Sequence, residues 1–265
     1  MADRVLLSAG LNNIEACIDL ACQHDLGIEV MGFAYPHVLD GDWQATLSTY
    51  KRVLASVRGP LAMHGPFMDM APGSPDRRIN QVCVERYQHA LQIAHDLGAE
   101  VIVFHANFIA SIQNEAYRRS WHRTNVTFWS RMADYAERLG VTLAVENMWE
   151  FDPHIIGDVL AEVDHPYLRA CVDVGHAHLF SKFPFEQWLD VMGRWLVHVH
   201  VNNNAGKLDV HGGLPYGVID YYEVLDRIRA LTCDPTFTLE MDKVEDMADS
   251  LPYFELAPQP TNNRR

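Results

Sequence analysis

Short apolar runs rich in β-branched residues recur along the chain, and stretches of helical periodicity lie between them. A short apolar run is typical of a buried strand, whereas apolar residues spaced three and four apart indicate an amphipathic helix. Strands are predicted at residues 5–9, 27–32, 61–64, 101–105, 142–146, 168–173, 197–201 and 236–240. Helices are predicted near residues 12–25, 43–57, 77–97, 115–139, 155–163, 184–193, 220–231 and 243–255.

This alternation of strand and helix predicts an α/β protein with parallel strands. Eight strands and eight helices within about 250 residues favour a single (β/α)8 TIM barrel, and a doubly wound sheet is the structural alternative. We expect residues 1–257 to form the barrel. Residues 258–265 form a polar C-terminal tail that we expect to lie outside it.

The composition agrees with a globular enzyme-sized domain: 265 residues, 48% hydrophobic and 21% charged. Such a composition excludes disordered and fibrous classes. The five cysteines lack CxxC spacing and are typical of reduced thiols in a cytosolic protein. The start of the chain lacks the apolar stretch of a signal peptide, and no apolar run approaches the ~18 residues of a membrane span. We therefore expect a cytoplasmic protein with no membrane contact.

Charge narrows the possible partners. Thirty-five acidic residues against 21 basic ones leave a net charge of −14 at pH 7. Because binding to a nucleic-acid backbone depends on clustered Lys and Arg, long nucleic acid is a poor partner for this chain. The 14 histidines, by contrast, point to a metal or proton-transfer site.

Metal-capable side chains occur at the ends of six consecutive predicted strands. In a (β/α)8 barrel these ends share one rim, where catalytic groups lie. A lone His at a strand end is usually just hydrogen-bonded, but six such groups at matching positions favour a metal site. They are His64, His105, Glu146, Asp173 with His176 shortly after it, His200 and Glu240. His198, two residues before His200, points to the same face of its strand. Mixed His and carboxylate ligands suit Zn²⁺, Mn²⁺, Co²⁺ or Fe²⁺ rather than Ca²⁺ or Mg²⁺.

The ordered set of motifs resembles the xylose isomerase-like TIM barrel superfamily. That superfamily contains sugar phosphate isomerases and epimerases and the endonuclease IV branch (AP endonuclease family 2). The resemblance covers about 180 residues, from the third predicted strand to the eighth. Its motifs are Met63-His64-Gly65-Pro66-Phe67, Phe104-His105, Val145-Glu146-Asn147, Val172-Asp173-Val174-Gly175-His176, His200-Val201-Asn202-Asn203, Asp209-Val210-His211 and Leu239-Glu240.

The resemblance implies between one and three divalent ions. In the isomerase branch it implies one ion, on Glu146, Asp173, His200 and Glu240. In the endonuclease IV branch it implies that same site and two further zinc ions, one on His64, His105 and Glu146 and one on His176, Asp209 and His211. Ketose epimerases carry an Arg six residues after the His of the seventh strand, where this chain has Gly206.

The function that we favour from the sequence is a metal-dependent sugar or sugar-phosphate isomerase or epimerase. Glu146 and Glu240 would move a proton on a metal-polarised substrate, and His176 would stabilise the enediolate oxygen. Lys207 or His64 would orient a terminal hydroxyl or phosphate. Phe67 and Trp149 belong to the aromatic residues expected to cover the sugar.

The alternative is a multi-zinc phosphoesterase acting on a small phosphate ester or, less readily, on DNA. Three ions would clamp the phosphodiester, and Glu146 would bridge two of them. Redox chemistry at a multi-iron cluster is a third possibility. A scaffold without turnover is disfavoured because neither Glu146 nor Glu240 is lost. A homodimer is compatible with the sequence.

Overall fold

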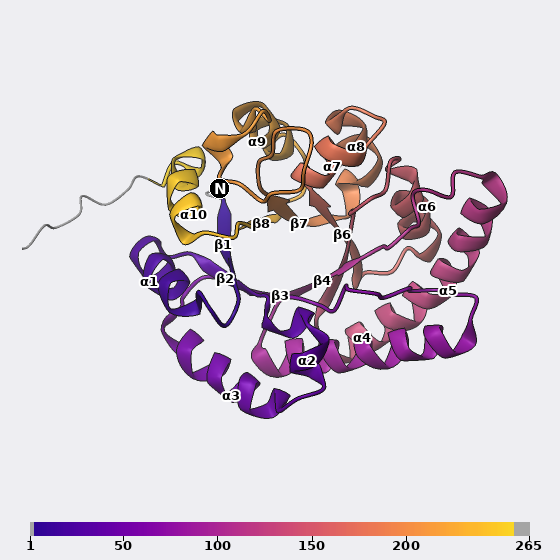
Figure 1. Ribbon diagram of the computed structural model, residues 1–265, viewed down its shortest axis with the longest axis horizontal. Coiled ribbons are helices and arrows are strands. Elements are labelled where there is room, and N and C mark those ends of the chain that lie inside the picture. Colours follow the sequence, from indigo (N-terminus) through magenta and orange to yellow (C-terminus); the bar gives the residue numbers. More distant parts are fainter. Residues whose placement is uncertain (1–2, 257–265) are drawn as a thin grey trace, which may run out of the picture.

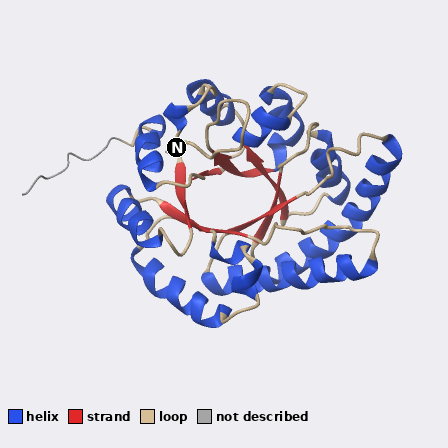
Figure 2. Ribbon diagram, in the orientation of Figure 1, coloured by secondary structure: helices blue, strands red, loops and turns tan. Residues whose placement is uncertain are grey.

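The computed structural model describes residues 3–256, and in these residues eight parallel strands close into one barrel (Figures 1 and 2). Each strand pairs with the next in the chain, and β1 pairs with β8. This closing pair confirms the predicted (β/α)8 barrel and excludes an open, doubly wound sheet. The strands are β1 (Arg4–Ala9), β2 (Gly27–Val30), β3 (Leu61–His64), β4 (Val101–His105), β5 (Thr142–Glu146), β6 (Leu168–Asp173), β7 (Leu196–Val201) and β8 (Thr236–Leu239).

Helices surround the barrel on its outside (Figure 2). The longest two match the predicted bounds, since Asp76 and Asn114 cap their first turns and Gly98 and Gly140 end them in the left-handed conformation. No helix of residues 3–256 has the length and apolarity that a membrane span requires. The α-helices are α1 (Ile14–His24), α2 (Pro36–Leu39), α3 (Trp43–Val53), α4 (Arg77–Leu97), α5 (Glu115–Leu139), α6 (His154–Val163), α7 (Val174–Phe180), α8 (Phe185–Met192), α9 (Tyr221–Arg229) and α10 (Val244–Ser250).

Two short helices differ from the sequence prediction. α2 lies in the loop after β2, which ends at Val30, two residues before the predicted end. α7 follows β6 directly and carries His176, in a segment where the sequence analysis predicted no helix. Asp173 caps α7 by accepting a hydrogen bond from the backbone N–H of His176. Asp173 at the end of β6 and His176 in the first turn of α7 therefore lie next to each other.

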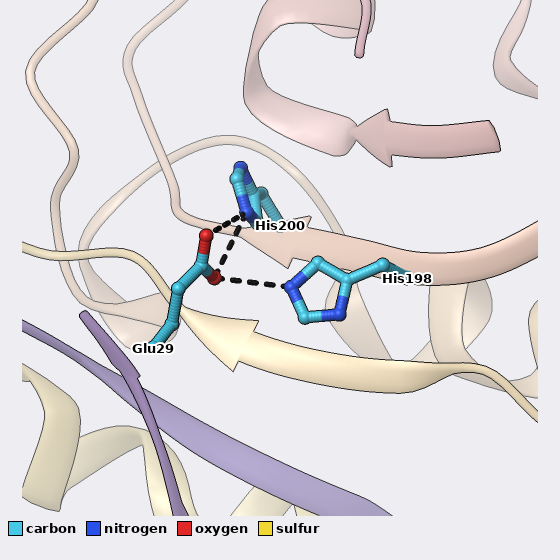
Figure 3. A group of neighbouring side chains, drawn as sticks. All are labelled: Glu29, His198 and His200. Carbon is cyan, nitrogen blue, oxygen red and sulfur yellow. Dashed lines mark hydrogen bonds and ion pairs between the residues drawn. The ribbon is translucent and has the colours of Figure 1, made fainter. Parts of the chain in front are cut away.

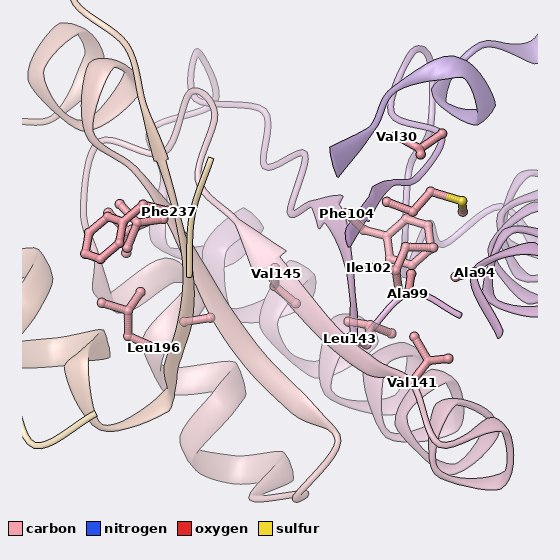
Figure 4. Close-up of a cluster of buried hydrophobic side chains, with 14 of the residues drawn as sticks. Val30, Ala94, Ala99, Ile102, Phe104, Val141, Leu143, Val145, Leu196 and Phe237 are labelled. Carbon is pink, nitrogen blue, oxygen red and sulfur yellow. The ribbon is translucent and has the colours of Figure 1, made fainter. Parts of the chain in front are cut away.

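The barrel has two apolar regions. Between the strands and the surrounding helices lies a large cluster that includes Ile102, Leu143 and Phe237 (Figure 4). A small cluster fills the barrel interior, consisting of Leu6, Ala62, Val101, Val103, Ala144 and Cys171. Because side chains two residues apart share a face, the strands that supply these apolar residues supply polar ones further along.

The predicted tail at residues 258–265 lies outside the described residues, as does residue 257 of the predicted barrel domain.

Candidate metal centre

Inward-facing positions at the carboxyl ends of the strands carry the candidate ligands. Val101 and Val103 face inward on β4, so His105, at the end of that strand, does too. Ala144 and Glu146 have the same relation on β5. The ligand side chains from strand ends are nearly or fully buried, with Glu240 the most exposed at 8%. The fold thus brings the predicted residues to one place.

Glu146 lies between two sets of histidines. Its Oε2 is 3.0 Å from Nε2 of His105 and 3.4 Å from Nε2 of His64. Its Oε1 is 3.1 Å from Nδ1 of His200 and 3.5 Å from Nδ1 of His176. The two oxygens of one fully buried carboxylate therefore face different partners.

Four residues form what we call the strand group: Glu146, Asp173, His200 and Glu240. Each offers one ligand atom, and these atoms all lie within 4.8 Å of one another. Nδ1 of His200 is 3.1 Å from Glu146 and 3.2 Å from Oε2 of Glu240. This is the set that the resemblance implies for a single ion. His64, Glu146 and His200 form a further group within the same limit.

A second set, the rim group, consists of His176, Asp209 and His211. Asp209 lies between the two imidazoles, with Oδ2 3.1 Å from Nε2 of His176 and Oδ1 3.2 Å from Nε2 of His211. The loop that carries Asp209 and His211 is closed by the antiparallel bridge between Asn203 and Gly212. These two side chains are 24% and 23% exposed. Eight of the nine predicted ligands thus belong to these groups, and the ninth, His105, contacts Glu146 at 3.0 Å.

Burial and charge shift the pKa values of these residues in opposite directions. Burial raises the pKa of Asp173 to about 6, and Glu240 and Glu146 add to the rise, while His176 opposes it. Burial lowers the pKa of His211, but Glu240 and Asp209 outweigh this effect and raise it to about 10. Burial would raise the pKa of Glu240, yet His200 and His211 bring it down to about 2. With its pKa at about 10, His211 thus carries a positive charge at neutral pH beside the ionised Glu240.

The donor set fits a divalent cation. Oε2 of Glu146, Oε2 of Glu240 and Nδ1 of His105 are buried and have no hydrogen-bond partner. Such atoms are uncommon, because buried polar groups are normally paired. The two carboxylate oxygens face imidazole nitrogens, and a mixture of imidazole and carboxylate ligands suits a divalent ion such as Zn²⁺, Mn²⁺, Co²⁺ or Fe²⁺.

Two asparagines that the sequence analysis did not assign hold Asp173. Asn147 donates to the backbone carbonyl of Asp173 at 3.0 Å and accepts from its N–H at 2.9 Å. Asn202 donates to Oδ2 of the carboxylate at 2.8 Å. Gly175 leaves room for this amide, since a Cβ there would clash with Oδ1 of Asn202. Each asparagine directly follows a barrel strand, and this position in the sequence could have indicated a role at the site.

Glu29, on β2, is a further buried carboxylate that the sequence analysis missed. It is fully buried and lies within hydrogen-bonding distance of His198 and His200 (Figure 3). His198 faces the barrel interior, as its spacing from His200 indicated. A charged residue within the apolar run Gly27-Ile28-Glu29-Val30 was the signal in the sequence.

A cavity of about 670 Å³ opens over the centre. Residues that follow β1, β2 and β8 line it, among them Asn12, Tyr35 and Asp242. Of the described residues that line the cavity, none is Lys or Arg. The remaining lining residues include His64, His105, His176, Asp209, His211 and Glu240.

The three predicted substrate residues differ in position. Phe67 lines the cavity, with its ring centroid 4.9 Å from that of His105. Trp149 and Lys207 are exposed and do not belong to the lining. Substrate contact by any of the three stays a prediction.

Two relatives share 27% of their aligned residues with this chain. The protein MJ1311 of Methanocaldococcus jannaschii is 27% identical over 197 residues, which cover 72% of this chain and 67% of that protein. The structure of the TTHB071 protein from Thermus thermophilus, soaked with ZnCl2, has a TM-score of 0.80 and 27% identity, and covers 95% of this chain and 96% of that one.

A third structure, of a D-tagatose 3-epimerase-like protein, has a TM-score of 0.79 and 23% identity, with 95% of this chain and 97% of that chain covered. At this identity the likeness concerns the fold. The sequence model of the xylose isomerase-like TIM barrel family matches residues 11–256, which are nearly all of the described barrel. The chain therefore belongs to the xylose isomerase-like TIM barrel family.

Proposed function

We propose that this protein is a metal-dependent sugar isomerase or epimerase. The observation that carries the proposal is the convergence of two buried carboxylates, Glu146 and Glu240, on Nδ1 of His200 beneath a cavity of about 670 Å³. The fold shared with a D-tagatose 3-epimerase-like protein supports it.

Glu146, Asp173, His200 and Glu240 would hold the divalent ion. When bound, such an ion polarises a carbonyl and its neighbouring hydroxyl. It thereby makes the proton on the hydroxyl-bearing carbon next to the carbonyl more acidic. Oε2 of Glu240, which is buried without a hydrogen-bond partner, supports this assignment. Zn²⁺, Mn²⁺, Co²⁺ and Fe²⁺ remain the candidate ions.

The chain's own residues supply the proton transfer. Glu240 lines the cavity and is ionised, since its pKa is lowered to about 2, and it is the carboxylate that would accept a proton from the substrate carbon. His176, also in the lining, is the residue that would donate a hydrogen bond to the oxygen on which negative charge develops, through the Nε2 that faces Asp209 in the free protein. Return of the proton to the other face gives an epimer, and its return to the next carbon gives an isomer. Glu146 is the second carboxylate proposed for this return.

The lining favours an uncharged sugar over a phosphorylated one. Proteins usually bind phosphate with Arg, Lys or backbone N–H groups at helix ends. The described lining residues include no Arg or Lys but do include Asn12, Asn13 and Asp242, which suit hydroxyl groups. We therefore propose a polyhydroxylated substrate without phosphate. The expected cytoplasmic location and homodimer stay predictions.

Solvent deuterium provides the test. Incubation of the wild-type protein with Mn²⁺, Co²⁺ or Zn²⁺ and a panel of ketoses in D₂O should place deuterium at one carbon of a substrate. The Glu240→Gln variant should lose about 10²- to 10⁴-fold in rate because it removes the proton acceptor. Turnover of a sugar without any deuterium uptake, or full activity of the variant, would contradict the mechanism.

A second candidate, a multi-zinc phosphoesterase, is supported by the contacts of Glu146. Its two oxygens face different histidines, as a bridging ligand between two ions would, and the rim group offers a third site. Hydrolysis of bis(p-nitrophenyl) phosphate together with three zinc ions per chain would favour this function. One ion per chain and no hydrolysis would favour the isomerase.

A further inference from the structure

Glu29 lies inside the barrel with no access to solvent. Its Oε2 is 3.0 Å from Nε2 of His198 and 3.1 Å from Nε2 of His200, while its Oε1 is 3.2 Å from the same atom of His200 (Figure 3). A carboxylate buried this deeply costs free energy unless donors surround it. The two imidazoles supply those donors.

The contact connects strands on different parts of the ring. In the closed order, β8 and β1 lie between β7 and β2, so Glu29 reaches across the interior to its histidines. On β8, Thr236 and Thr238 pair in register with His198 and His200. Both hydroxyls contact His198, Thr236 at Nδ1 and Thr238 at Nε2. Three strands therefore contribute to one buried network.

Glu29, His198 and His200 lie close enough together to hold a metal ion, but we assign hydrogen bonds to this network instead. Both nitrogens of His198 already have polar partners, in Thr236 and Glu29. Nε2 of His200 is likewise directed at Glu29. The network and the strand group share the ring of His200. The network contacts Nε2 of this ring, whereas the carboxylates of the strand group contact Nδ1.

A carboxylate only accepts hydrogen bonds, so the Nε2 atom of His200 that faces Glu29 carries the proton. In the neutral imidazole the lone pair is then on Nδ1. That atom is the one 3.1 Å from Glu146 and 3.2 Å from Glu240. Histidine ligands of metals commonly donate their other N–H to a carboxylate, which fixes the ring and strengthens the ligand.

We propose that Glu29 is a positioning residue of the metal centre: it fixes the tautomer and orientation of His200, and His198 in turn holds Glu29. The inference rests on the proposed metal site but not on the reaction catalysed there. Glu29 is not among the residues that line the cavity, so it acts through His200 and not on a substrate.

The test measures the binding of Co²⁺ by the metal-free full-length protein, in competition with a chelator, and records the visible absorption of bound Co²⁺. In Glu29→Gln the amide group offers a donor to His200, which permits the wrong tautomer. We expect affinity to fall by about 10- to 100-fold and the absorption bands to shift. Glu29→Asp keeps the charge and should recover part of the affinity.

Val103→Ala is the matched control. Val103 is a fully buried residue of the barrel interior in the apolar cluster, so its truncation loosens the barrel without removing a polar group. It should lower the melting temperature and leave the Co²⁺ spectrum unchanged. An equal change of affinity and spectrum in Val103→Ala would assign a merely structural role to Glu29 and overturn the proposal.

His198→Gln decides the question if Glu29→Gln does not fold. Removal of the imidazole loosens Glu29, so a measurable loss of affinity with a shifted spectrum supports the proposal, and wild-type binding overturns it. Wild-type binding by a folded Glu29→Gln variant overturns it equally. If the wild-type protein itself bound no Co²⁺, the proposed metal site would fail instead.

Discussion

The strand group and the rim group differ in what holds them. Asp173 and Glu146 end barrel strands and are fully buried, and asparagine side chains fix Asp173 from two sides. Asp209 and His211 lie instead on a loop after β7 and are about one quarter exposed. Ligands built on a rigid scaffold need little ordering when an ion binds, whereas loop ligands must be ordered. We therefore expect the strand group to bind its ion more tightly.

The largest effect is expected from Glu146→Gln, because this residue contacts four histidines. The change removes the charge that these imidazoles surround. Turnover should fall by about 10²- to 10⁴-fold, as for loss of a proton-transfer group, and metal content should drop as well. Elemental analysis and a rate assay measure both effects. A variant with normal metal content and normal rate would show that the strand group is not the centre of the chemistry.

Asp209→Asn should have a smaller effect that separates the two groups. It removes the carboxylate between His176 and His211 and should abolish only an ion bound at the rim. If the protein is an isomerase, the rate should fall less than the roughly 10²-fold expected for a catalytic acid or base. The number of metal ions bound per chain and the reaction rate, measured on the same variant, test this expectation. A loss as large as that of Glu146→Gln would favour the multi-zinc phosphoesterase.

The smallest effect concerns pH and the rim group of the metal-free protein. The pKa of His211 is raised to about 10, so its ion pairs with Glu240 and Asp209 stabilise the fold. This contribution is fully present below the unfolded value of about 6.5 and is lost as pH rises toward 10. The melting temperature should decline modestly over this range. In His211→Asn this part of the decline should be absent, and an unchanged pH profile would contradict the assignment.

The sequence predicted most of the fold because the relevant patterns are local. The two-residue period of a strand was enough to predict the strand at residues 142–146 and the alternating ligand positions. The missed contacts are between distant residues, since Glu29 and His200 are 171 positions apart. Helix α7 was missed because it starts directly after β6, without a loop. The contact between Glu29 and His200 depends on closure of the barrel, and the start of α7 depends on side-chain packing. The periodicity of the sequence carries no information about either.

The closure of the sheet through β1 and β8 has a consequence for the choice of ion. Most of the ligands stand on neighbouring strands of a ring, so the distances between them follow the spacing of those strands. In an open sheet, an edge strand could move outward to admit a larger ion, but a closed barrel has no edge strand. A shift of one ligand strand would therefore displace the ligands on the neighbouring strands. For an ion held by the strand group, we therefore expect the closed sheet to restrict the ionic radius, because all the strands of the ring are connected.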